Sequence, residues 1–169
     1  MNSLIIHYSY TGNNKKLAKA ISNKLQADCI ELKETRKRSV LTILLDILFN
    51  RTPRINDIKK QLENSDYLIL VAPVWFGKIG TPLRTVFQTI KNTNKQISLT
   101  SLSAGADGIN PNLEKEIIKR AGIKPKTVIN FLISDLLPKN PKPNYKALDN
   151  YKISEIEADT IVDKIINQL

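Results

Sequence analysis

Five short apolar runs recur along the chain, and each has the length and composition of a buried β-strand. They cover residues 4–8 (LIIHY), 29–32 (CIEL), 67–73 (YLILVAP), 97–104 (ISLTSLSA) and 127–133 (TVINFLI). Between and after them, apolar side chains recur at helical spacing over residues 17–25, 83–90, 113–121 and 153–166. Strands that alternate with helices form βαβ units, so the pattern predicts an α/β fold with helices on both faces of a doubly wound parallel sheet.

Two segments do not fit this alternation. Residues 36–57 (RKRSVLTILLDILFNRTPRIND) place an apolar, helix-like run over 40–49 between two basic flanks, which predicts an inserted helix after the second strand. That helix could pack over the sheet edge or a ligand entrance, or it could meet a membrane surface or a second copy of the chain. Residues 136–145 (LLPKNPKPNY) are rich in Pro and Lys and predict an extended, solvated loop.

Length and composition limit the number of domains and the kinds of site that the chain can form. A chain of 169 residues with 41% hydrophobic residues is expected to form a single domain over residues 1–169. No apolar run approaches the roughly 20 residues of a membrane span, and the N-terminus lacks the basic and apolar regions of a signal peptide. We therefore expect a cytoplasmic protein without a transmembrane segment. The single Cys29 excludes an intramolecular disulfide and a cysteine-based metal cluster, and no metal site is predicted.

The segment after the first strand has the composition of a phosphate-binding loop. Ser9 to Asn14 (SYTGNN) lead from the strand into a helix, where backbone N–H groups point outward and commonly hold an anion. Gly12 allows the backbone to approach that anion, and Ser9, Thr11 and the two asparagines add neutral donors. The loop has neither the Gly-Lys-Ser/Thr of a Walker motif nor the three glycines of the dinucleotide fingerprint. The alternative is that Thr11 or Asn13 only caps the helix.

The third and fourth strands also end in glycine-containing loops. The third is followed by PVWFGKIGTP, which contains the only tryptophan, Trp75, and a proline at the start of the next helix. A flat aromatic beside a phosphate loop would suit a ligand with a planar ring, although Trp75 could instead cover the top of the core. The fourth strand ends in SAGADG (residues 103–108), whose N–H groups could meet the carbonyl oxygens of such a ring.

Taken together, these loops resemble those of the flavodoxin-like FMN-binding proteins. The matching residues are Ser9-Tyr10-Thr11-Gly12-Asn13-Asn14, for the pattern S-x-T-G-N-T, and Pro73 to Pro82, for the pattern P-V-W-x-G-x-x-x-x-P. The resemblance implies the strand order 2-1-3-4-5, a helical insertion after the second strand as in a subgroup of these proteins, and FMN as the cofactor. It places the FMN phosphate on residues 9–14 and the isoalloxazine ring between residues 73–80 and 103–108. The cofactor-binding residues expected from it are Ser9, Tyr10, Thr11, Gly12, Asn13, Asn14, Pro73, Val74, Trp75, Phe76, Gly77, Ser103, Ala104, Gly105 and Asp107.

The sequence departs from this family in two places. Asn14 stands where the motif ends in threonine, which keeps a donor and loses the hydroxyl. The loop SAGADGINP carries no aromatic that could stack on the outer flavin face, so Trp75 is left as the main stacking residue, or the face is open to a substrate. An open face favours an enzyme over a shielded carrier.

The net charge of the chain indicates which kinds of partner it could bind. With 26 Lys and Arg against 16 Asp and Glu, the formal charge is +10, whereas flavodoxins that act as carriers are typically acidic. The sequence predicts a basic rim around the flavin, with a solvated surface as the alternative. Its residues are Arg36, Lys37, Arg38, Arg51, Arg54, Lys78, Arg84, Lys139 and Lys142.

Three functions follow as hypotheses. The first is an FMN-dependent oxidoreductase that passes electrons from NAD(P)H to a quinone, a flavin or another small acceptor. The second is a non-enzymatic electron-transfer module with an acidic redox protein as partner. The third is an anion- or nucleic-acid-binding domain without flavin, although no alternation of aromatic and basic residues marks a nucleic-acid face, so no nucleic acid is expected. The sequence leaves open whether the chain forms a homodimer.

Three further residues have simpler interpretations. His7 is interpreted as a core or strand-end residue, Cys29 as a small buried hydrophobe, and Asp107 as a flavin contact or a turn residue.

Overall fold

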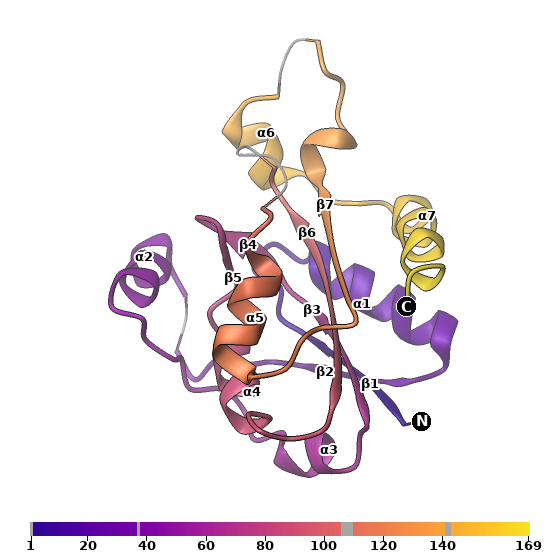
Figure 1. Ribbon diagram of the computed structural model, residues 1–169. Helices are drawn as coiled ribbons and strands as arrows, with labels where there is room; N and C mark the ends of the chain where they lie inside the picture. Colours follow the sequence, from indigo (N-terminus) through magenta and orange to yellow (C-terminus); the bar gives the residue numbers. More distant parts are fainter. Residues whose placement is uncertain (1, 37, 106–109, 141–142) are drawn as a thin grey trace.

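Five strands form one parallel sheet in the computed structural model, which describes residues 2–36, 38–105, 110–140 and 143–169 (Figure 1). The strands are β1 (Ser3–His7), β2 (Asp28–Glu31), β3 (Tyr67–Val71), β6 (Gln96–Ser103) and β7 (Thr127–Leu132). Their order is β2-β1-β3-β6-β7, with every neighbouring pair parallel. Because β3, β6 and β7 are the third, fourth and fifth strands of this sheet, the predicted order 2-1-3-4-5 is confirmed.

Helices cover both faces of the sheet, as predicted. On one face, α1 (Asn13–Leu25) and α7 (Glu155–Ile166) pack side by side over Ile5, Ile69 and Val71. On the other, α4 (Leu83–Thr89) and α5 (Leu113–Ala121), with the short α3 (Lys59–Glu63), pack over Leu4 and Ile6. The alternation of side chains along β1 therefore divides the buried residues into two cores.

Several short elements were not predicted. The loop after β3 contains a hairpin of β4 (Val74–Trp75) and β5 (Lys78–Ile79). A 3-10 helix, η1 (Ile133–Asp135), follows β7, and α6 (Tyr145–Asn150) begins at the last residue of the segment expected to be a loop. Elements of two to six residues have too few positions to show a period, which explains why the sequence pattern missed them.

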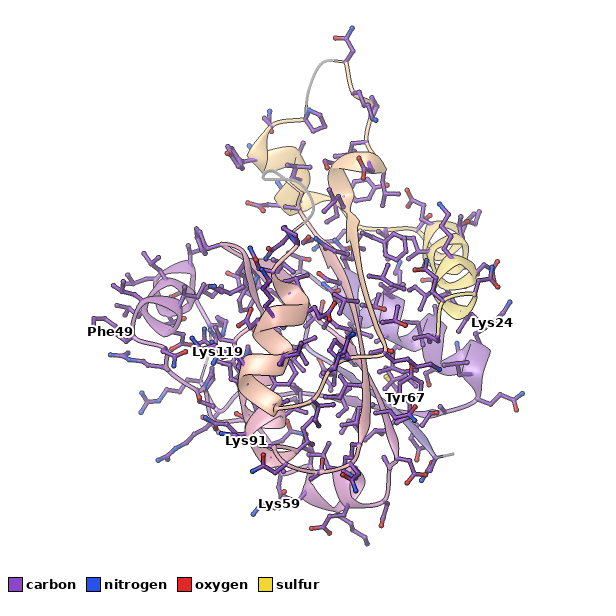
Figure 2. The ribbon with its side chains drawn as sticks, viewed as in Figure 1. Lys24, Phe49, Lys59, Tyr67, Lys91 and Lys119 are labelled. Carbon is purple, nitrogen blue, oxygen red and sulfur yellow. The ribbon has the colours of Figure 1, made fainter. Side chains whose placement is uncertain are left out.

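The inserted helix is present as α2 (Val40–Leu48), between β2 and α3. Its first turn is closed by a capping box, in which Ser39 and Thr42 bond to each other's backbone N–H. Ile43 is the only one of its residues that is fully buried, and Val40, Leu41, Leu44 and Leu48 form an exposed apolar stripe that ends at Phe49. In Figure 2, Phe49 lies at the outer edge of the molecule. The sequence thus predicted the helix, and the structure shows how little of its apolar surface is covered.

Within the described ranges, no helix has both the length and the apolar character that a membrane crossing requires.

Candidate functional site

The loop between β1 and α1 presents an uncapped helix N-terminus. Gly12 has φ 98°, a left-handed conformation, and its N–H donates to Ser9 Oγ at 3.0 Å. Helix α1 begins at Asn13, and no side chain among the described residues caps it. The first N–H groups of a helix have no partner within it, so those of α1 stay available to an outside acceptor. The alternative that Thr11 or Asn13 merely caps α1 is therefore wrong.

The asparagine side chains of this loop point inward. Asn14 is buried and pairs with both backbone groups of Leu102 in β6, donating to its carbonyl at 2.9 Å and accepting from its N–H at 3.0 Å. Asn13, also buried, donates to the Tyr151 carbonyl and accepts from the Ile153 N–H. Our expectation that these two amides supply donors to a ligand is corrected: they fix the loop to neighbouring elements, and only their backbone N–H groups remain for an anion.

A lysine that sequence reasoning missed lies beside the same loop. The Nζ of Lys152 donates to the Thr11 carbonyl, although the two residues are 141 positions apart. Lys152 is exposed and belongs to the segment that enters α7, and α7 packs on α1. No local pattern marks a lone lysine at such a distance, so only the tertiary structure could reveal it. Its charge adds to the positive end of the α1 dipole and favours an anion at this loop.

Trp75 lies at the switch point of the sheet, where the chain order reverses between β1 and β3. Its ring makes edge contacts with Tyr8 (5.6 Å between ring centroids) and Tyr10 (6.1 Å), and the Arg38 guanidinium lies 5.6 Å from its centroid. Trp75 is half-buried and packs against the core. The tryptophan therefore both covers the core, which was the alternative reading, and connects the loops after β1 and β3.

The next residue, Phe76, offers the more open aromatic ring. Phe76 and Gly77 are the two turn residues of the β4–β5 hairpin, with φ 47° and 70°. Positive φ at both positions is the signature of a type I′ turn, which strongly prefers Asn-Gly. An aromatic residue with positive φ is strained, yet the Phe76 side chain is 63% exposed and gains little from packing. Strain without packing is a mark of a functional position.

The loop after β6 comes against this hairpin. The Asn110 amide donates to the Gly77 carbonyl at 2.6 Å, which joins the two loops. Gly105 has φ 85°, and a Cβ there would lie 2.8 Å from the Leu132 Cβ, so only glycine fits. Ser103 is buried and donates to the Asn130 Oδ1 at 3.0 Å. Asp107 lies outside the described residues.

The predicted site residues that the structure describes are thus gathered at one end of the sheet. Those that stay wholly or partly accessible are Ser9, Tyr10, Thr11, Gly12, Val74, Trp75, Phe76, Gly77, Ala104 and Gly105. Asn13, Asn14, Pro73 and Ser103 are buried and form the supports of the loops. The tyrosine–tryptophan contact joins the first loop to the second, and the Asn110 bond joins the second to the third. A ligand at this end would meet helix N–H groups, a lysine and an exposed aromatic.

Two arginines of the predicted basic rim are not exposed. Arg38 is held by the carboxylates of Glu34 and Asp46. Burial lowers the pKa of Arg38, but these two carboxylates outweigh it and raise the pKa overall. Arg84 is buried and donates to the carbonyls of Asp46 and Arg51 at 2.8 and 2.7 Å. Both arginines hold the insertion in place, whereas Arg36, Arg51, Arg54, Lys78 and Lys139 of the predicted rim are exposed. The rim positions 37 and 142 lie outside the described residues.

His7 is a core residue, in agreement with its sequence interpretation. It is 3% exposed, and burial lowers the pKa of its imidazole from 6.5 to about 4. Its ring is therefore neutral at pH 7. Cys29 is partly buried, and burial raises the pKa of its thiol to about 11, so it is a poor nucleophile.

By sequence, the chain matches no protein-family model and no curated protein. By structure, it is similar to a flavoprotein in complex with FMN from Lactobacillus acidophilus NCFM (23% identity, 76% of this chain and 92% of that one, TM-score 0.63). It is also similar to a candidate flavoprotein from Bacteroides uniformis ATCC 8492 (13% identity, 96% of this chain and 97% of that one, TM-score 0.71). A third similar structure is the Trp repressor binding protein from Bacillus subtilis (12% identity, 100% of this chain and 99% of that one, TM-score 0.59). At these identities the likeness concerns the fold alone, and together with the strand order it establishes that the chain has the flavodoxin-like fold.

Proposed function

We propose that this chain of flavodoxin-like fold, as a single domain, binds FMN and acts as an oxidoreductase that passes electrons from NAD(P)H to a quinone, a flavin or another small acceptor. The observation that carries the proposal is the uncapped N-terminus of α1, entered through Gly12 with φ 98° at the switch point of the sheet. A helix N-terminus at that place suits a phosphate monoester such as that of FMN.

The residues present fit the cofactor. Nothing among the described residues lies within 4 Å of the position that a Gly12 Cβ would take, so the space beside this glycine is open. Backbone N–H groups of residues 13 and 14, with the charge of Lys152, would hold the phosphate. Phe76 and Trp75 would contact the ring system, and the loop at 103–105 would border its edge. When bound, FMN supplies the exchange of hydride and of single electrons, while the chain binds and orients it.

A visible absorption spectrum tests the cofactor and the reaction together. We expect FMN added to the purified protein to show saturable, perturbed flavin bands near one equivalent. NADPH added without any reductase should then bleach these bands well above the rate with free FMN. Perturbed bands that do not bleach would favour a carrier. If no binding occurs at high FMN concentration, the cofactor assignment fails and an anion-binding domain without flavin is left.

The substitution Phe76→Asn separates the stability of the hairpin from cofactor binding. Asparagine is preferred at this type I′ position, so we expect the free energy of unfolding to rise by about 0.5 kcal/mol. Loss of the aromatic contact should raise the Kd for FMN about fivefold, which corresponds to about 1 kcal/mol. Urea unfolding without FMN and a flavin titration measure the two effects. An unchanged Kd would mean that Phe76 does not touch the flavin.

A second candidate is electron transfer to an acidic redox protein, without enzymatic activity. The exposed apolar stripe of α2 (Val40, Leu41, Leu44, Leu48), with Arg36 before it and Arg51 and Arg54 after it, favours such a partner. A patch that is apolar at its centre and charged at its rim is typical of a docking surface. The same stripe could join two copies of the chain as a homodimer. Carrier and enzyme are distinguished by the bleaching step above.

A further inference from the structure

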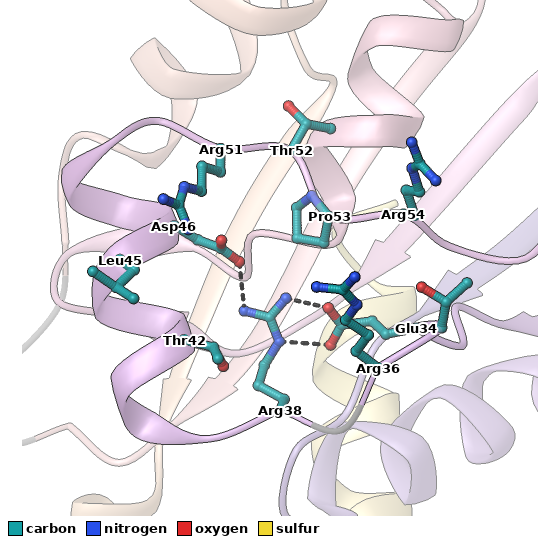
Figure 3. Close-up of a pocket in the computed structure, with 11 residues that line it drawn as sticks. Glu34, Arg36, Arg38, Thr42, Leu45, Asp46, Arg51, Thr52, Pro53 and Arg54 are labelled. Atoms are coloured by element: carbon teal, nitrogen blue, oxygen red, sulfur yellow. Dashed lines mark hydrogen bonds and ion pairs between the residues drawn. The ribbon is translucent and has the colours of Figure 1, made fainter.

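A hollow of about 620 Å³ lies beneath the inserted helix α2. Its walls come from residues 34–36 with Arg38, from residues 51–54, and from one side of α2. Figure 3 shows these side chains gathered around it. The lining residues are Glu34, Thr35, Arg36, Arg38, Thr42, Leu45, Asp46, Arg51, Thr52, Pro53 and Arg54. The hollow is therefore a product of the insertion, separate from the loops that would hold FMN.

The back of the hollow is a fixed network. Arg38 bonds to Glu34 on one side and to Asp46, at 2.9 Å, on the other, and its side chain is only 5% exposed. The Thr35 N–H donates to the Arg54 carbonyl at 3.4 Å, which ties the two stretches of chain together. The two Arg84 bonds to carbonyls described above hold the segment between residues 46 and 51. Because so many partners fix this wall, it is organised before any ligand arrives.

The front of the hollow carries positive charge that the described residues do not balance. Four arginines line it and only two carboxylates do, so the net charge is 4 − 2 = +2. Both carboxylates are engaged by Arg38. Within the described ranges, no ion pair joins the side chains of Arg36, Arg51 or Arg54 to a carboxylate. Three exposed guanidinium groups around one hollow suit a phosphate group, which they can bind in a bidentate manner.

The hollow adjoins the candidate flavin site. Arg38 forms part of its wall and also lies 5.6 Å from the Trp75 ring centroid. Tyr8, whose ring contacts Trp75, donates to Glu34 in the same wall at 2.9 Å. Burial and the Glu34 carboxylate raise the pKa of Tyr8, so this phenol keeps its proton and its hydrogen bond. One layer of side chains thus separates the hollow from the aromatic loop.

We propose that this hollow is a binding site for a phosphate group, and that a phosphorylated molecule held there lies beside the flavin site. The part about the flavin rests on the proposed function; the anion site does not. The phosphate could belong to a nucleotide reductant that carries a 2′-phosphate, or it could be free pyrophosphate. In both cases the three arginines supply the binding energy.

Isothermal titration calorimetry on the full chain tests the site with two probes, inorganic pyrophosphate and adenosine 2′,5′-bisphosphate. The variant Arg36→Gln/Arg51→Gln/Arg54→Gln should raise the Kd of the bound probe roughly tenfold or more, since charge-assisted hydrogen bonds are lost. The control Lys59→Gln/Lys91→Gln/Lys124→Gln removes the same charge from exposed residues of segments that precede β3, β6 and β7. Figure 2 places Lys59 and Lys91 far from α2. The control should change the Kd by less than about twofold.

The outcomes distinguish a nucleotide phosphate from a free anion, and they test the anion site separately from the proposed flavin function. Tighter binding of the bisphosphate indicates a nucleotide, and tighter binding of pyrophosphate indicates a free anion. The proposal fails if neither probe binds at millimolar concentration, or if both triple variants weaken binding equally, since net charge alone would then explain it. A flavin titration of the arginine variant is the second readout. An unchanged Kd for FMN shows that the two sites are distinct. If FMN does not bind at all, the proposed function fails, and the probe titration alone still decides on the anion site.

Discussion

Replacing Asn14 by alanine is expected to lower the free energy of unfolding by about 2–4 kcal/mol, a large part of the stability of a small domain. The Asn14 amide satisfies both the N–H and the carbonyl of Leu102, and all of these atoms are buried. Alanine would leave two backbone groups without partners in a region that water does not reach. The loss should appear as a lower urea midpoint with an unchanged slope.

The control for this change is Asn23→Ala, on the same helix but exposed. It should change the free energy of unfolding by less than about 0.5 kcal/mol. The variant Asn14→Thr, which restores the threonine of the resembled motif, is informative as well. A threonine hydroxyl cannot bond to both groups of Leu102, so we expect it to destabilise the protein too. If it instead tightened FMN binding at no cost in stability, Asn14 would be a defect in a phosphate loop and not a support.

The fold could be predicted because its signals repeat. Each of the five strands lies in a short stretch that is rich in apolar residues, and each is followed by a helix-like stretch or a loop with glycine or proline. The burial of β3, in which every residue is inaccessible, is the kind of feature that composition reveals. The β4–β5 hairpin was invisible because its two strands have two residues each and its turn carries Phe-Gly in place of Asn-Gly.

The sequence predicted which loops form the candidate site, but not what each side chain in them does. Gly12 and the aromatic loop after β3 were found because glycine and tryptophan are rare in this chain and stand at strand ends. The roles of Asn13, Asn14 and Lys152 depend on contacts with residues 88 to 141 positions away, which no local pattern encodes. Likewise, Arg38 and Arg84 lie in the interior because the insertion brings a carboxylate to Arg38 and backbone carbonyls to Arg84. The sequence pattern does not show these contacts.

Replacing Gly12 by alanine should separate a phosphate loop from a simple turn. With φ 98°, an alanine costs about 1–2 kcal/mol in backbone strain, even though its Cβ would meet nothing within 4 Å. Any relaxation of φ moves the N–H groups of residues 13 and 14, on which the anion depends. We expect the Kd for FMN to rise roughly 10- to 100-fold, the equivalent of one or two charge-assisted hydrogen bonds. Flavin titration without denaturant measures the Kd, and urea unfolding measures the free energy of unfolding.

Gly122→Ala is the matched control. Gly122 has φ 69° and ends α5, and a Cβ there would meet only Asn92 Oδ1, at 3.7 Å. Its backbone strain is therefore of the same kind as that at Gly12, but it follows α5 at the end of the sheet where β7 begins. It should lose a similar amount of stability and keep the Kd for FMN within about twofold. If both variants bind FMN equally well, Gly12 only turns the chain, and the phosphate must be held elsewhere. A large loss of affinity at Gly12 alone would place the phosphate on the N-terminus of α1.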